Sequence, residues 1–116
     1  MRANHALYSY NYLYKISDNQ AFIDKMISLF INSVTEYTGD LQQLQVTKVL
    51  HDLKRTVHKL KPSVLSMEVA GAKEIILKLE EAGKWNEEVE RLVEQLKVIF
   101  QQIKPMMEED LIQLNK

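Results

Sequence analysis

Apolar residues recur at three- and four-residue steps along most of the chain, which is the spacing of amphipathic α-helices. The pattern predicts helices over about 11–16, 19–44, 47–67, 72–82 and from about 86 onward. Ser17-Asp18-Asn19 is a good start for the second of these helices, because its short polar side chains can accept from free backbone N–H groups, and Asn86 can cap the last. The sum predicts an all-α protein, an antiparallel four-helix bundle with a short additional N-terminal helix.

Three small or cyclic residues qualify this pattern. Gly39 allows a bend or break in the long helix, and Gly71 marks a turn or a weak helix start. Pro105 is expected to bend or end the last helix, with Met106–Leu114 following as a further helical piece.

Four tyrosines alternate with other residues near the N-terminus: Tyr8, Tyr10, Tyr12 and Tyr14. Alternation can indicate a β-strand, but the sequence offers no evident partner strand. We therefore expect a loose N-terminal segment that leads into the short helix. The tyrosines are expected to cap one end of the bundle; a site built from them is the less favoured alternative.

Composition narrows the class of protein. The chain has 116 residues, of which 46% are hydrophobic and 27% charged, so we expect a single domain over 1–116. The absence of cysteine excludes disulfides and thiolate chemistry.

No apolar run approaches the ~20 residues of a membrane span, and no signal sequence opens the chain. We expect a cytoplasmic protein without membrane insertion. The net charge of -1 argues against a nucleic-acid partner.

The predicted central helix has two different faces. Its apolar stripe consists of Val49, Leu50, Leu53, Val57, Leu60 and Val64. At 100° per residue, a second set of residues turns away from this stripe: Thr47, His51, Lys54, Arg55, His58 and Lys61. This basic face suits docking onto an acidic pocket of another protein. The alternative is an ordinary solvated helix surface.

His58 is the candidate reactive residue. A neutral imidazole is a good nucleophile, and its attack on an activated phosphoryl group would give a phosphohistidine. Lys61 and Lys54 lie one turn away on either side and could offset the phosphoryl charge. The alternative, on helix pattern alone, is a merely exposed histidine. His51 is either the rim of a docking surface or a spectator. Two turns separate His51 from His58, too far for one metal ion, so no metal site is expected.

Signatures of an enzyme are missing from the sequence. There is no Gly-rich phosphate loop, and the serines have no recognisable catalytic partners. The paired acids Glu80-Glu81, Glu87-Glu88 and Glu108-Glu109 are expected at helix ends or on exposed faces, where solvation explains them. A small bundle enzyme would instead need a pocket lined by perturbed acids.

The stretch His58-Lys59-Leu60-Lys61-Pro62-Ser63 resembles the histidine-containing phosphotransfer (HPt) domain of bacterial phosphorelays, whose pattern is His-x-Leu-Lys-Gly-Ser. Upstream, Tyr12–Ser17 and Phe22–Phe30 look like the first two helices of that family. Downstream, Leu79-Glu80 resembles its Leu-Glu pair in the helix after the active one. The resemblance covers most of the chain in the right order, and implies a four-helix bundle with an exposed, phosphorylated histidine.

The resemblance also implies a function. His58 would accept a phosphoryl group from an aspartyl phosphate on a response-regulator receiver domain and pass it to another receiver. Lys61, with Lys54, would assist the phosphoryl group, while His51 and Arg55 would help to dock the partner. Leu65, which departs from the family pattern, would lie at the docking surface and either narrow it or supply an apolar contact to it. Mg²⁺ would belong to the receiver, so this chain would need no cofactor of its own and would lack kinase activity. A hybrid sensor kinase is a second candidate partner, and a monomer is expected because the active face must stay open.

Three residues depart from the family pattern. Pro62 replaces the usual glycine, Leu65 replaces a small residue, and Glu68 stands where the family commonly has a glycine at the turn. A kink beside His58 is expected from Pro62. Glu68 leaves the end of the active helix undecided. The competing function is a non-catalytic helical module that binds a response regulator or sensor kinase without phosphoryl transfer.

Overall fold

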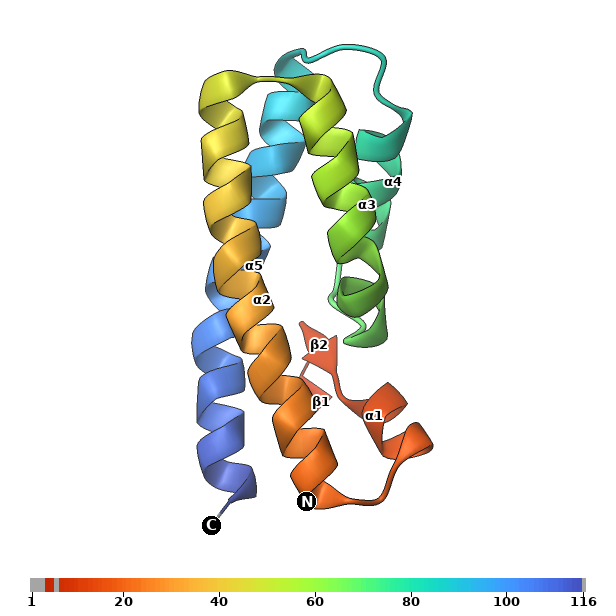
Figure 1. The fold of residues 1–116 in the computed structure, drawn as a ribbon, viewed down its shortest axis with the longest axis vertical. Helices are drawn as coiled ribbons and strands as arrows, with labels where there is room; N and C mark the ends of the chain where they lie inside the picture. The colour runs from red at the N-terminus through yellow and green to blue at the C-terminus, as the bar shows by residue number, and fades with distance from the viewer. Residues whose placement is uncertain (1–3, 6, 116) are drawn as a thin grey trace.

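The computed structural model describes residues 4–5 and 7–115, and it is an antiparallel four-helix bundle preceded by a short helix, as predicted (Figure 1). The four helices of the bundle, α2 to α5, alternate in direction along the chain (Figure 1). The helices are α1 (Asn11–Ile16), α2 (Gln20–Thr47), α3 (Leu50–Ser66), α4 (Ala72–Glu81) and α5 (Glu87–Leu114).

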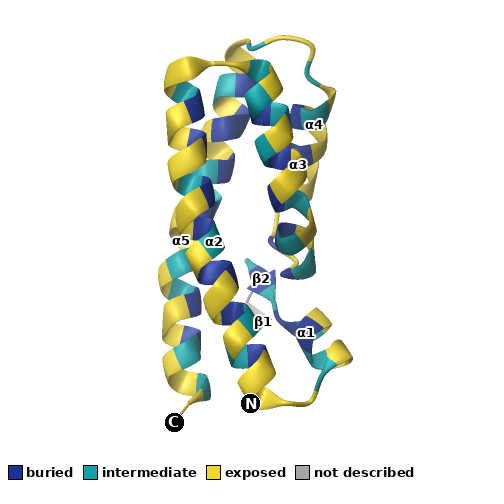
Figure 2. Cartoon of the chain, viewed as in Figure 1, coloured by how far each residue is buried: buried dark blue, intermediate teal, exposed yellow. Residues whose placement is uncertain are grey.

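The bundle is elongated, 46 × 22 × 21 Å, because α2 and α5 are each 28 residues long. The helices α3 and α4 have 17 and 10 residues, so they cover only part of the long pair. The N-terminal segment occupies the remaining part, below the end of α3 (Figure 1). Buried residues lie on the sides of the helices that face one another (Figure 2).

Helix boundaries follow the predicted stripes with one shift. Leu53, Val57, Leu60 and Val64 of α3 are all fully buried, as the pattern predicted. The assignment of Val49 to this stripe was wrong, because Val49 precedes α3 as its N-cap residue and is 44% exposed.

The chain reverses just before Val49. Lys48 adopts a left-handed conformation with φ of 55°, which ends α2 and turns the chain toward α3. Thr47 was predicted on the basic face of the central helix, but it is the last residue of α2.

The cap predicted at Asn86 is confirmed, and of the predicted helix start at residues 17–19 it is Asn19 that caps α2. The Asn19 side chain accepts a hydrogen bond from the Phe22 N–H at 3.1 Å, and Asn86 accepts one from the Val89 N–H at 2.9 Å. Each satisfies a backbone donor that the first turn of a helix leaves free. Gly71 precedes α4 with a φ of 80°, a left-handed conformation that glycine adopts without steric cost.

Neither Pro105 nor Gly39 breaks its helix. Pro105 was expected to bend or end the last helix, and the helix does not end there, since α5 is one helix through to Leu114. Pro105 is exposed, while Ile103 and Met107 on either side are fully buried. Burial of these neighbours outweighs the lost backbone hydrogen bond. The helix α3 likewise continues past Pro62 to Ser66, and α2 continues past Gly39.

The N-terminal segment differs most from the prediction. The strands β1 (Asn4–His5) and β2 (Tyr8–Ser9) pair antiparallel, so a partner strand does exist, three residues upstream. Tyr8 and Tyr10 are fully buried, which corrects the expected loose segment from Leu7 onward. Tyr12 is 47% exposed, so only part of the tyrosine set packs against the bundle. Residues 1–3 and 6 lie outside the described residues.

The two long helices prompt the question of a membrane span. In the described part of the chain, no helix has both the length and the apolar character that crossing a membrane requires.

Candidate functional site

His58 lies in the middle of α3 with its side chain 85% exposed. Its helical neighbours Val57 and Leu60 are fully buried, and they fix the side of α3 that carries His58 toward solvent. His51 and Leu65 come seven residues before and after His58, so the three side chains line up at two-turn intervals. His51 is exposed, and Leu65 is 36% exposed.

Glu80 of α4 reaches the same site, although it was expected to be an ordinary solvated acid. Its Oε2 atom lies 3.8 Å from Nδ1 of His58, and its Oε1 atom accepts a 2.9 Å hydrogen bond from Nζ of Lys61. Its side chain is only 23% exposed. Glu80 follows the fully buried Leu79, so the packing of α4 onto α3 places this carboxylate beside the histidine. The Leu79-Glu80 pair was the sequence signal that could have found it.

This contact distinguishes the two ring nitrogens of His58. Nδ1 faces the carboxylate of Glu80, which leaves Nε2 on the outward side of the ring. At 3.8 Å the contact is longer than a hydrogen bond, and it becomes an ion pair when the imidazole is charged. A ring with one nitrogen facing an acid and the other facing solvent is arranged for reaction at the outward nitrogen.

The basic face of α3 is less uniform than its composition suggests. Lys61 is 32% exposed and paired with Glu80, and Lys54, one turn before His58, is half-buried. Arg55 contacts Asp52 at 3.0 Å on the helix surface. That exposed pair contributes little to stability, but it offsets part of the local positive charge.

An apolar cavity of about 410 Å³ lies between α1, α2 and α3. Its lining includes Tyr12 and Ile16 of α1, Leu29 of α2, and Ser63 and Ser66 of α3. The sequence analysis did not assign a site here. The available signal was an excess of apolar residues on α1. Only Leu13 of that helix is buried, and the apolar side chain of Ile16 is 53% exposed.

We name this cavity the α1–α3 groove, defined by Tyr12, Leu13, Ile16, Met26, Leu29, Phe30, Ser33, Ser63, Ser66 and Met67. Leu65 lines a neighbouring hollow together with Tyr12 and Lys15. The groove and the line of His51, His58 and Leu65 therefore share helix α3.

The turn after α3 contains Glu68, one of the three residues that depart from the family pattern. The helix ends at Ser66, and Glu68 follows with a left-handed φ of 49°. A residue with a Cβ pays about 1 kcal/mol for this conformation, whereas glycine does not. The turn is therefore made with a glutamate in a conformation that favours glycine.

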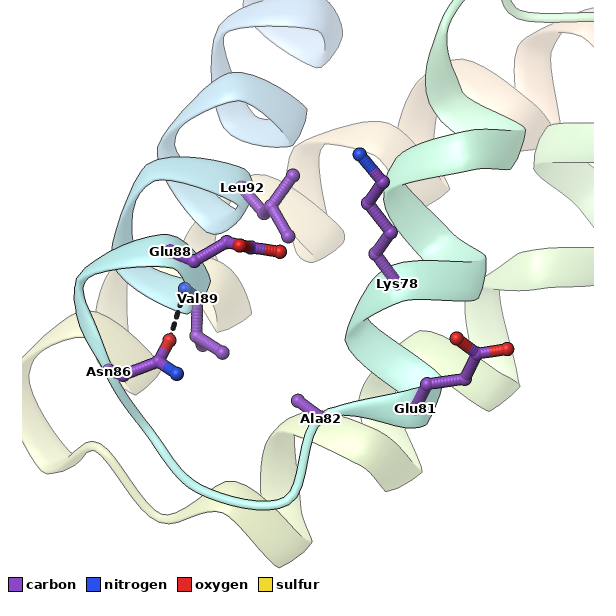
Figure 3. Close-up of a pocket in the computed structure, with 7 residues that line it drawn as sticks. All are labelled: Lys78, Glu81, Ala82, Asn86, Glu88, Val89 and Leu92. Carbon is purple, nitrogen blue, oxygen red and sulfur yellow. Dashed lines mark hydrogen bonds between the residues drawn. The ribbon is translucent and has the colours of Figure 1, made fainter.

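A second cavity, of about 260 Å³, lies between the end of α4 and the start of α5 (Figure 3). Its lining residues are Lys78, Glu81, Ala82, Asn86, Glu88, Val89 and Leu92. All of them belong to α4, α5 or the connecting turn, and the Asn86 cap of α5 forms part of its wall (Figure 3). This cavity is thus separate from the exposed face of α3. Among the described residues, no three His, Asp or Glu side chains are grouped to hold a metal ion.

Comparison with protein families identifies the class. A family model described as the Hpt domain matches residues 25–111. The chain belongs to the Hpt domain family. Hpt domains are phosphocarriers of two-component phosphorelays that interact with receiver domains and kinases and have no kinase activity of their own. Comparisons with curated proteins and with solved structures gave no match.

Proposed function

We propose that this protein carries a phosphoryl group on Nε2 of His58, which it accepts from one receiver domain and passes to another. The observation that carries the proposal is the exposed His58, with an acidic side chain at Nδ1 and a lysine one turn away. Family membership supports the same reaction class.

The reaction balances with the side chains present. The Nε2 lone pair attacks phosphorus of the receiver's aspartyl phosphate, the P–O bond breaks, and its electron pair returns to the aspartate. The new N–P bond leaves positive charge on the imidazole, which the carboxylate of Glu80 faces. Onward transfer reverses these steps, with a second aspartate attacking phosphorus and the P–N electron pair returning to Nε2.

Lysine side chains assist the phosphoryl group in this proposal. Lys61 lies at i+3 from His58 and shares its carboxylate partner, so its ammonium can turn from Glu80 to the incoming phosphoryl oxygens. Lys54 lies at i-4, on the other side of His58. Mg²⁺ is expected on the receiver, and we assign no cofactor to this chain.

The docking surface combines charge with apolar contact. His51, Lys54 and Arg55 provide positive or titratable groups, while Leu65 and the α1–α3 groove provide apolar area. Such a surface suits a receiver whose acidic phosphorylation pocket is bordered by apolar side chains. A dimer that covered this face would block transfer, so the carrier is expected to act as a monomer.

The test is phosphoryl transfer from a panel of labelled, phosphorylated receiver domains to the purified protein. Wild type should acquire an acid-labile, base-stable label, as a phosphoramidate bond requires. His58→Gln should lose the label completely, while His51→Gln, which changes only the proposed docking surface, should still acquire it, at a lower rate. Binding of receivers without transfer would favour a non-catalytic interaction module. Transfer to the His58→Gln variant would show that another residue carries the phosphoryl group.

A further inference from the structure

Residues 7–16 pack closely on the bundle, although they precede the part of the chain that matches the family. Tyr8, Tyr10 and Leu13 are each no more than 1% exposed. The segment that carries them lies below the end of α3, where the shorter helices α3 and α4 do not reach along the long helix pair (Figures 1 and 2). The segment is therefore an integral part of the folded domain.

One attachment of this segment is a buried cluster of polar side chains. The hydroxyls of Tyr8 and Tyr10 both donate to Oδ2 of Asp110 on α5, the second at 2.7 Å. Asp110 is only 6% exposed, in a position where charged residues are rare unless they are paired. Burial, followed by the interaction with Asp110, raises the pKa of both tyrosines, so both hydroxyls remain protonated donors at neutral pH.

A second attachment joins the segment to the turn after α3. The Ser9 N–H donates to the Met67 carbonyl at 2.9 Å, and the Ala70 N–H donates to the Leu7 carbonyl at 2.8 Å. These bonds and the Asp110 cluster fix the chain immediately before α1. They connect α5 to the end of the helix that carries His58.

The helix α1 has little to hold it in place by itself. It has six residues, too few for an isolated helix, and it buries only Leu13. Yet Tyr12 and Ile16, which it leaves exposed, form the α1 wall of the α1–α3 groove. The position of that wall thus depends on the two attachments that precede it.

We infer that the Tyr8–Asp110 and Tyr10–Asp110 hydrogen bonds position the receiver-docking surface, because they hold residues 7–16, and with them the α1 wall of the α1–α3 groove, in place. Asp110 is a positioning residue, because it acts on docking through α1. The inference rests on the proposed function, since the partner in the groove is a receiver domain.

The first test uses Asp110→Ala in the full chain, which leaves two buried hydroxyls without their acceptor. Hydrogen exchange should become faster at the Ser9 and Ala70 amides while the amides of α2 and α5 stay protected. Receiver affinity should fall by roughly tenfold or more. Phosphorylation of His58 by phosphoramidate, a small donor that needs no docking surface, should proceed at the wild-type rate.

The second test removes the groove wall without touching the attachments. Ile16→Ser should weaken receiver binding as Asp110→Ala does, and the two losses combined should be less than additive because both act on the same contact. Ile112→Ser is the matched control, since Ile112 is a similarly exposed isoleucine that lies on α5 away from the groove. It should leave receiver affinity unchanged.

Several results would overturn the inference. Normal receiver affinity in Asp110→Ala or Ile16→Ser would show that α1 is not a docking wall, and fully additive losses would show that Asp110 acts elsewhere. Global unfolding of Asp110→Ala would show that the segment belongs to the cooperative core rather than to a separable element. A wild-type protein that accepts no phosphoryl group from any receiver overturns the proposed function and this inference together. Normal wild-type transfer with unaffected variants overturns the inference alone.

Discussion

At the scale of single residues, one carboxylate organises the exposed face of α3. Glu80 contacts both the imidazole of His58 and the ammonium of Lys61, and it comes from a different helix. In the proposed transfer, its charge would face the ring that becomes positive when Nε2 attacks phosphorus, and it would compete with the phosphoryl group for Lys61. The proposal therefore gives Glu80 an effect on both the nucleophile and the group that neutralises phosphate.

Glu80→Gln is expected to slow phosphorylation of His58 roughly tenfold, because a charge-assisted contact to the ring contributes about 1.5 kcal/mol or more. The loss should appear with both receiver and phosphoramidate donors, unlike the loss in the Asp110 variant. Glu81→Gln is the matched control, since Glu81 is exposed and lines the other cavity. Nitrogen-15 NMR of His58 should show a smaller share of the Nδ1–H tautomer in Glu80→Gln. Wild-type rates in this variant would contradict the role.

At the scale of helices and strands, packing decides several features against local preference. The helix α5 runs through Pro105, and the N-terminal tyrosines pack on α5 although they are 100 residues from Asp110 in sequence. Both outcomes follow from burial of apolar neighbours along the two long helices. Because Tyr8 and Tyr10 are buried against Asp110, we expect the free energy of unfolding to vary with pH in the alkaline range.

Stability should fall as pH rises above about 10, the reference pKa of tyrosine. A raised pKa means that the folded protein keeps the tyrosine protons that the unfolded chain releases, so unfolding becomes more favourable as pH rises. Each tyrosine then contributes a loss of about 1.4 kcal/mol per pH unit. Urea denaturation between pH 8 and 11 measures this slope.

Two variants separate this effect from the general titration of lysines. Tyr10→Phe should give a shallower dependence of unfolding free energy on pH. Tyr12→Phe removes an exposed tyrosine and should keep the wild-type slope. Equal slopes in all three proteins would show that the buried cluster does not control alkaline stability.

At the scale of the whole molecule, charge is distributed unevenly on a nearly neutral chain. The net charge is -1, yet α3 presents His51, Lys54, Arg55 and Lys59 near His58 while α5 opens with Glu87, Glu88 and Glu90. A local field of this kind mainly affects the rate at which a charged partner is captured.

Lys54→Glu is therefore expected to slow association with an acidic receiver roughly tenfold at low ionic strength, with a smaller effect at high salt. Arg91→Glu makes the same change of charge on an exposed position of α5 and should have a much smaller effect. Stopped-flow association at several salt concentrations measures both. Equal effects of the two variants would indicate a response to net charge rather than to the α3 face.

The amino-acid sequence determined the features that depend on neighbouring residues. Periodicity located the four helices of the bundle, residues 17–19 and Asn86 marked two helix starts, and the position of His58 opposite Leu53, Val57 and Leu60 predicted its exposure. These follow because helical geometry relates residues three and four apart. The family pattern around His58 was likewise readable from six consecutive residues.

Tertiary structure alone decided the features that join distant segments. Glu80 reaches His58 only because α4 packs antiparallel on α3, and Asp110 meets Tyr8 and Tyr10 only because α5 extends past α3 and α4. The α1–α3 groove, the left-handed turn at Glu68 and the unbroken helix at Pro105 depend in the same way on which faces meet. No local pattern encodes these contacts, because their energy comes from the burial of several helices against one another.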